Sequence, residues 1–203
     1  MDDARSARDA IRRGDLRGPA LRGLLDALAP TDRDAWLDRV LGIEELPEDG
    51  EDLPRGGVPY LPCAVDDVLA IVHACPLDAR TLVVDLGSGL GRVPILVHLL
   101  TGARARGIEV QSALVSRARA IASELSLDAV WFTHADVRDA DLEGDLFVLY
   151  APFSGAILEH TLGRLIDLST RQLVHVATID LELPPPFVVM TRARERVCIH
   201  RVA

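Results

Sequence analysis

Residues 84–92 read Val-Asp-Leu-Gly-Ser-Gly-Leu-Gly-Arg, and this stretch decides the fold of the chain. It overlaps the end of a β-branched apolar run over residues 81–86, which predicts a buried strand, and precedes an apolar run over 93–100, which predicts a helix. Its three glycines allow a tight turn and a close approach of a ligand to the backbone. The next helix would point its free N–H groups at that ligand. The stretch therefore predicts a ligand-binding turn between a strand and a helix.

The spacing of the glycines and the acid before them narrow the class of ligand. Gly87, Gly89 and Gly91 follow the pattern G-x-G-x-G, whereas dinucleotide-binding folds use G-x-G-x-x-G. Asp85 stands two residues before the first glycine, and its carboxylate would repel a diphosphate. The sulfonium and ammonium groups of S-adenosylmethionine (SAM) are both positive, so the acid favours SAM over a dinucleotide.

Two further acids follow the next two predicted strands. Glu109 ends the strand predicted over residues 105–110, where a carboxylate can accept hydrogen bonds from both ribose hydroxyls. Asp136 follows the strand predicted over 130–134, where it can accept from the adenine amine. Taken alone, Glu109 reads as a solvated strand-end acid and Asp136 as a helix cap or turn former. The order of three acids at three successive strand ends favours one shared ligand site.

The rest of the chain divides into a helical beginning and an alternating α/β part. Residues 4–41 predict helices with breaks at 14, 18–19 and 30, and Thr31 or Asp32 is expected to cap the second of them. Residues 44–52 are mostly acidic and predict a solvated linker. We therefore divide the chain into a helical N-terminal extension with its linker, residues 1–50, and a ligand-binding domain, residues 51–203.

Strands and helices alternate after the linker, which predicts a parallel sheet with helices on both faces. Further strands are expected over residues 146–150 and 173–179, and helices over 66–74, 112–125 and 157–168. Residues 187–190 and 197–202 predict an antiparallel hairpin closed by the polar stretch TRARER.

Four segments resemble motifs of a known enzyme family. VVDLGSGLGR, GIEV, HADV and LFVLYAP are similar to motifs I to IV of the class I SAM-dependent methyltransferases, over about residues 58–202. The resemblance implies a Rossmann-like, mostly parallel sheet with a C-terminal antiparallel hairpin, and SAM as the cofactor. It implies that the motif I residues surround the methionine part of SAM: Asp85, Gly87, Ser88, Gly89 and Gly91. It places Glu109 on the ribose and Asp136 on the adenine. Prolines 184–186 leave little room for the usual last helix, so a trimmed fold is expected.

A finer resemblance concerns the segment before motif I. Residues 58–62, Val-Pro-Tyr-Leu-Pro, together with DLGSG and LYAP, are similar to small protein-lysine methyltransferases of the ATP-synthase c-subunit type. In that family the segment folds over the cofactor, which implies that Tyr60 lies near the methionine part. The alternative is that Tyr60 is a packing aromatic between two prolines.

The candidates for the methyl-transfer step follow the fourth strand. Tyr150 is expected to hydrogen-bond a substrate amine and Phe153 to wall its channel, or else both pack in the core. Arg92 is expected either to pair with Asp85 or to contact the SAM carboxylate. No D/N-P-P-Y/F motif is present, which disfavours methylation of amides or base amines. The arginines of residues 191–196 form a basic turn, either solvated or in contact with an acidic partner.

Composition limits the partners. The net charge of -9 repels nucleic acid and counts against a nucleic-acid acceptor, although a local basic patch can override it. The three cysteines lack metal-ligand spacing, so no metal site is expected, and they favour the cytoplasm. No apolar run is long enough for a membrane span. The favoured function is a SAM-dependent methyltransferase acting on a protein, with lysine as the candidate residue. The alternatives are a small-molecule methyltransferase with the N-terminal helices as a lid, or a non-catalytic SAM-binding subunit. The sequence does not predict the oligomeric state.

Overall fold

The computed structural model describes residues 2–45 and 53–202, so most of the predicted acidic linker lies outside the described residues. The helices are α1 (Asp2–Arg13), α2 (Gly18–Ala27), α3 (Pro30–Leu41), α4 (Val65–Ala74), α5 (Arg92–Thr101), α6 (Ser112–Glu124) and α7 (Gly155–Ser169). The strands are β1 (Leu82–Leu86), β2 (Arg104–Glu109), β3 (Val130–His134), β4 (Leu146–Leu149), β5 (His175–Ile179), β6 (Phe187–Arg194) and β7 (Val197–Val202).

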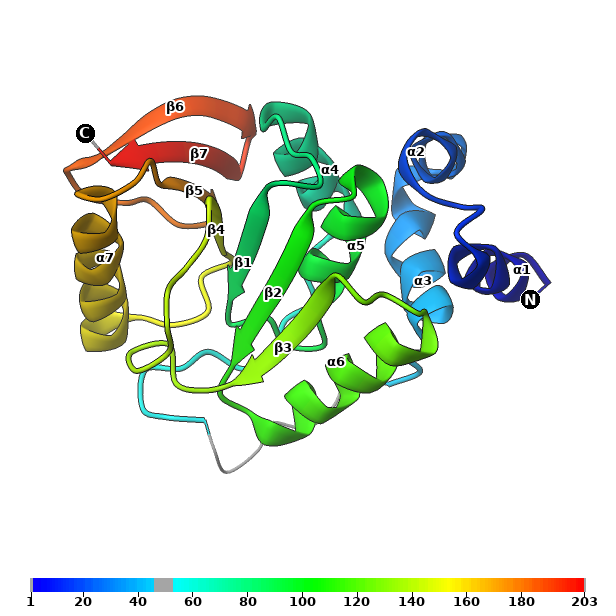
Figure 1. Cartoon of the computed structure of the whole chain (residues 1–203), viewed down its shortest axis with the longest axis horizontal. Helices are drawn as coiled ribbons and strands as arrows, with labels where there is room; N and C mark the ends of the chain where they lie inside the picture. The colour runs from blue at the N-terminus through cyan, green and yellow to red at the C-terminus, as the bar shows by residue number, and fades with distance from the viewer. Residues whose placement is uncertain (1, 46–52, 203) are drawn as a thin grey trace.

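All seven strands form one sheet in the order β3-β2-β1-β4-β5-β7-β6 (Figure 1). Strands β1 to β5 are parallel, and β7 runs antiparallel between β5 and β6. The carboxyl ends of β1 to β5 therefore meet at one edge of the sheet, where open α/β folds bind their ligands. The predicted mostly parallel sheet with a C-terminal antiparallel hairpin is confirmed.

The sheet buries a hydrophobic cluster on each face, as the alternation along β1 requires. Val83 joins the cluster that includes side chains of α4, α5 and α6, while Val84 and Leu86 join the one that includes α7. All five residues of β1 are buried, as expected for a central parallel strand. Core side chains on both faces of the sheet therefore hold β1, and with it the start of the turn that follows.

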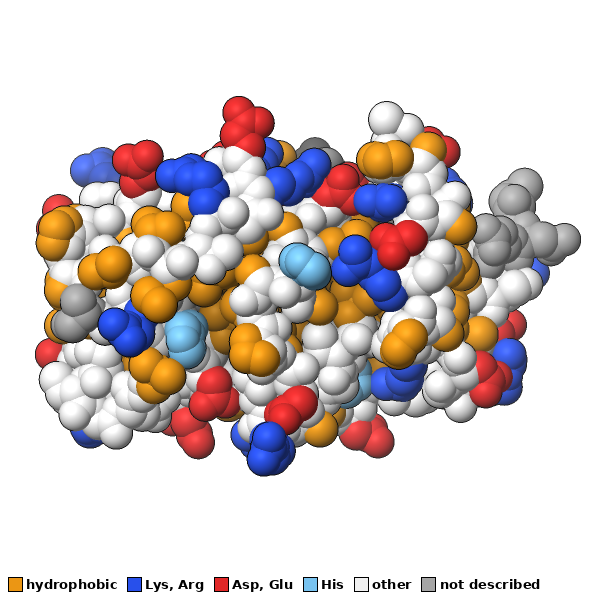
Figure 2. All heavy atoms as spheres, turned by 90° about the horizontal axis from the view of Figure 1, so that it is seen from above, with side chains coloured by type: hydrophobic (Ala, Val, Ile, Leu, Met, Phe, Trp, Pro, Cys, Tyr) orange, Lys and Arg blue, Asp and Glu red, His pale blue; other side chains and the backbone are white. Residues whose placement is uncertain are grey.

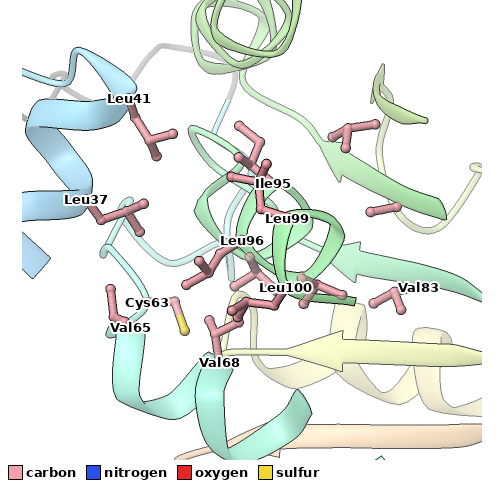
Figure 3. Close-up of a cluster of buried hydrophobic side chains, with 14 of the residues drawn as sticks. Leu37, Leu41, Cys63, Val65, Val68, Val83, Ile95, Leu96, Leu99 and Leu100 are labelled. Atoms are coloured by element: carbon pink, nitrogen blue, oxygen red, sulfur yellow. The ribbon is translucent and has the colours of Figure 1, made fainter. Parts of the chain in front are cut away.

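Of the three N-terminal helices, α2 packs against α5 and α3 against α4, while α1 packs against α3. In Figure 3, Leu37 and Leu41 of α3 approach Ile95 and Leu96 of α5, and all four belong to one buried cluster. A carboxylate oxygen of Asp34 on α3 also accepts a hydrogen bond from the first backbone N–H of α4, at 2.9 Å. The boundary at residue 50 stays a prediction.

Two local predictions are wrong. Helix α3 begins at Pro30 with Ala29 as its N-cap, so Thr31 and Asp32 lie inside the first turn and cap nothing. Proline at the first helical position needs no N–H partner, which explains this start. Strand β6 runs on to Arg194 through two register shifts, so the hairpin turn is shorter than predicted. The residues described between β5 and β6 form no helix, in line with the prolines there.

The surface carries charges of both signs. The face seen from above shows arginines and acids interspersed around exposed hydrophobic side chains (Figure 2). None of the helices described is long and apolar enough to cross a membrane.

Candidate active site

The glycine turn between β1 and α5 is packed tightly by the chain's own side chains. Gly89 has φ of 52°, and a Cβ there would lie 2.1 Å from the ring of Tyr60. Gly91 has φ of 83°, and a Cβ there would lie 2.3 Å from the ring of Phe132. A larger residue at either position would therefore be strained and would clash. The turn needs glycine for its own packing before any ligand arrives.

Glu109 holds the turn in place. One oxygen of its carboxylate accepts a hydrogen bond from the Gly89 N–H at 2.9 Å, and the other accepts from the Gln111 N–H at 2.9 Å. The side chain is buried at the end of β2. A carboxylate offers about four acceptor positions, so capacity for ligand hydroxyls remains.

Asp85 is a buried acid beside this turn, with an exposed fraction of only 4%. Burial raises the pKa of its carboxyl well above the usual range, and the nearby charge of Glu109 raises it further. A cation placed beside Asp85 would reverse this effect by favouring the ionised form.

The predicted alternative that Arg92 pairs with Asp85 is wrong. The Arg92 guanidinium is buried and lies 2.6 Å from a carboxylate oxygen of Asp34 and 3.1 Å from one of Asp38. Both acids come from α3, and both satisfy a cation that would otherwise be buried without a partner. Arg92 therefore ties the N-terminal helices to the start of α5.

A pocket of about 220 Å³ opens beside the turn at the carboxyl ends of the strands. Five of the predicted site residues line it: Tyr60, Gly87, Glu109, Asp136 and Tyr150. The other four do not line it and belong to the end of β1 and the turn: Asp85, Ser88, Gly89 and Gly91. The structure thus gathers the three predicted acids and both tyrosines around the glycine turn and the pocket beside it.

Residues 53–61 form a roof over the pocket. The Val58 N–H donates to the Pro152 carbonyl at 3.0 Å, and the Ser154 N–H donates to the Gly56 carbonyl at 2.9 Å. These bonds join the roof to the loop after β4. The sequence pointed to Tyr60 alone in this segment, because a proline-rich stretch has no periodicity that reveals its path.

Asp136 is the acid on the β3 side of the pocket. Its carboxylate accepts from the Arg138 N–H at 2.9 Å and pairs with the Arg138 guanidinium at 2.6 Å. The hydrogen bond from the Arg138 side chain lowers the pKa of Asp136, so the group is ionised at neutral pH.

Asp180 lines the opposite side of the pocket, and sequence reasoning missed it. It directly follows β5, just as Asp136 follows β3 closely, so the same strand-end signal was present. Phe153, predicted as a channel wall, also lines the pocket and belongs to the buried core.

The strand order and a glycine turn with acids at three strand ends define a SAM-binding α/β fold of the class I methyltransferase type. No family model and no curated protein matches the chain. It is similar to an RNA methyltransferase from Salinibacter ruber solved with S-adenosylhomocysteine, at 26% identity and a TM-score of 0.55, over 70% of this chain and 92% of that one.

Two further solved structures share the fold. One is TrmN from Thermus thermophilus, at 18% identity and TM-score 0.53, over 67% of this chain and 48% of that one. The other is a ribosomal protein methylase from Lactobacillus delbrueckii subsp. bulgaricus, at 19% identity and TM-score 0.51, over 68% and 75%. The chain therefore has the fold of the class I SAM-dependent methyltransferases, and the comparisons support an enzyme of this class with SAM as its cofactor.

Proposed function

We propose that this methyltransferase acts on an amine of a protein, in the first place a lysine side chain. The observation that carries the proposal is the charge of the pocket. Among the residues described there, every charged side chain that lines it is acidic: Glu109, Asp136 and Asp180. Such a pocket attracts cations: Glu109 and Asp136 face the cofactor, and Asp180 is left to face a lysine, which is a cation on an otherwise apolar arm.

We assign the cofactor to the first two of these acids. Glu109 binds the ribose hydroxyls and Asp136 accepts from the adenine amine. The methionine part lies against the turn, with Tyr60 beside it and the following motif I residues around it: Asp85, Gly87, Ser88, Gly89 and Gly91. When bound, SAM supplies a methyl group activated by a sulfonium.

Tyr150 is the proposed substrate-facing residue. Its side chain lines the pocket next to Ala151, Pro152 and Phe153. The acceptor nitrogen needs a free lone pair, so its ammonium form must first lose a proton to water. The Tyr150 hydroxyl can then align that nitrogen, and Phe153 can keep water away.

The rim of the pocket favours a macromolecular acceptor. Val58 and Leu61 both line the pocket, with exposed fractions of 41% and 60%. Apolar side chains exposed beside an acidic pocket suit a peptide that carries a basic residue. This arrangement counts against the alternative of a small molecule enclosed by a lid.

RNA is the second candidate acceptor. It is favoured by the likeness to the Salinibacter ruber protein, an RNA methyltransferase. The net charge of -9 and the lack of basic side chains among the described pocket lining count against it.

Incubation with SAM carrying a radiolabelled methyl group distinguishes these acceptors. Protein extract, total RNA and a small-molecule fraction would each be offered, and hydrolysed protein would be analysed for methyl-lysine. We expect label in methyl-lysine, reduced about tenfold or more by Tyr150→Phe because alignment of the nitrogen is lost. Methyl label found in RNA alone would contradict the lysine proposal and favour RNA as the acceptor. Label in the small-molecule fraction alone, or none while SAM is bound, would contradict both.

We also propose that the protein acts in the cytoplasm. The three cysteines are free and two of them are buried, which suits a reducing compartment.

A further inference from the structure

Arg196, in the turn between β6 and β7, contacts three other parts of the fold beside the pocket. Its guanidinium carbon lies 5.2 Å from the centre of the Tyr150 ring. Its Nη2 lies 2.7 Å from Oδ2 of Asp180, and its Nε lies 3.4 Å from Oδ2 of Asp67. A cation over an aromatic face and two ion pairs give this side chain a defined place.

The contact with Asp67 anchors Arg196 to the body of the protein. Asp67 lies on α4, and its side chain is 1% exposed. A buried carboxylate is stable only when it has a cationic or hydrogen-bonding partner. Arg196 and Arg194 are its two cationic partners, the second at 3.1 Å. The predicted basic turn therefore contacts acids of its own chain.

The backbone beside Arg196 is strained where it meets the pocket. Asp180 has φ of 52° and Ala151 has φ of 39°, and both residues line the pocket. In the described chain, Ser126 is the one other non-glycine residue with positive φ. Such strain persists where the surroundings impose it. Here the Asp180 N–H donates to the Arg196 carbonyl at 3.0 Å, in addition to the side-chain ion pair.

We propose that Arg196 is a positioning residue for the acceptor side of the pocket. It holds the ring of Tyr150 and the carboxylate of Asp180 at the pocket wall, and Asp180 binds the cationic end of the acceptor. The C-terminal hairpin is thereby part of the active site. This inference rests on the proposed function, whose acceptor is an amine.

Binding of three cofactor analogues tests the inference before the natural acceptor is known. The first is S-adenosylhomocysteine. The other two replace its sulfur by nitrogen that carries either a 4-aminobutyl or a butyl arm, so they differ in one ammonium. For the wild type we expect the aminobutyl compound to bind about tenfold tighter than the butyl compound, because Asp180 meets the ammonium.

Three variants and one control test whether Asp180 and Arg196 cause this difference in affinity. In Asp180→Asn and Arg196→Ala the ratio of the two affinities falls to about one, while S-adenosylhomocysteine binds within about twofold of the wild type. Arg196→Lys keeps the positive charge, so its ratio of affinities should lie between those of Arg196→Ala and the wild type. Arg192→Ala is the control, because Arg192 is on the same hairpin and donates to the Glu195 carbonyl at 3.2 Å. It should leave the ratio unchanged.

The outcomes separate this inference from the proposed function. A wild type that does not bind S-adenosylhomocysteine contradicts the cofactor assignment. A wild type that binds it, yet binds both arms equally, overturns the role of Asp180. An unchanged ratio in Arg196→Ala overturns the role of Arg196. If Arg196→Ala fails to fold, as judged by its melting temperature, Arg196→Lys and Asp180→Asn decide.

Discussion

Asp85 costs stability in the free protein because its carboxyl is buried. Burial is the main cause of its raised pKa, and the charge of Glu109 adds to it. The native state therefore keeps the Asp85 proton at pH values where the unfolded chain has lost it. Stability contributed by this group falls as pH rises from the usual aspartate pKa toward the raised native value. A cationic methionine moiety would remove this penalty.

Asp85→Asn should therefore separate stability from binding. The amide carries no charge to desolvate, so the melting temperature of the free protein at neutral pH should rise, by about 2–4 °C for each ~1 kcal/mol gained. The affinity for SAM should fall about tenfold or more, because the opposite charge is gone. Scanning calorimetry and titration calorimetry measure the two effects.

The opposite result would contradict the role of Asp85 in binding the cationic part of SAM. A variant that melts lower but binds SAM like the wild type would make Asp85 a structural hydrogen-bonding residue. At this scale, the motif I acid was recognisable from sequence because it precedes a glycine turn. Its degree of burial was not, because that depends on residues brought in from elsewhere in the chain, among them Glu109 of β2, Tyr60 and Cys63.

At the scale of elements, the contact between α3 and α5 joins the N-terminal helices to the glycine turn between β1 and α5. Arg92 is the first residue of α5 and is 3% exposed, while Asp34 and Asp38 are 48% and 27% exposed. A cation at a helix N-terminus is opposed by the helix dipole, so these carboxylates are needed to hold it there.

The double variant Asp34→Asn with Asp38→Asn should destabilise the protein by about 2 kcal/mol, below the full value for a buried pair because both acids are partly exposed. Arg92→Met should destabilise the protein less than the double variant does, because it removes the buried charge together with its need for partners. Urea unfolding gives both values. Asp32→Asn, exposed in the first turn of the same helix, is the matched control and should change stability by less than about 0.5 kcal/mol. A double variant as stable as this control would contradict the account.

Sequence patterns predicted most elements to within a few residues, because apolar periodicity and β-branched runs act locally. They failed at the start of α3, where a proline and not a cap begins the helix, and at β6, where bulges extend a polar strand. The pairing of Arg92 with α3 joins residues far apart in sequence. No local pattern predicts such a contact.

At the scale of the whole molecule, the site was predictable where it depends on strand ends. Parallel strands bring their carboxyl ends to one edge, so the order of the strands along the chain is enough to place Glu109 and Asp136 together. The roof of residues 53–61 and the Arg196 turn were not predictable, because both reach the pocket through the path of the chain around the sheet.

The central claim is that this pocket binds SAM through the acids at its strand ends. Titration calorimetry with S-adenosylhomocysteine tests it most directly, with NADH as the competing cofactor class and Glu109→Ala as the variant. We predict one site per chain with micromolar affinity, no heat with NADH, and binding weakened about tenfold or more in Glu109→Ala, whose fold is checked by circular dichroism. A folded wild type that binds no S-adenosylhomocysteine, or a Glu109→Ala variant that binds it equally well, would contradict the claim.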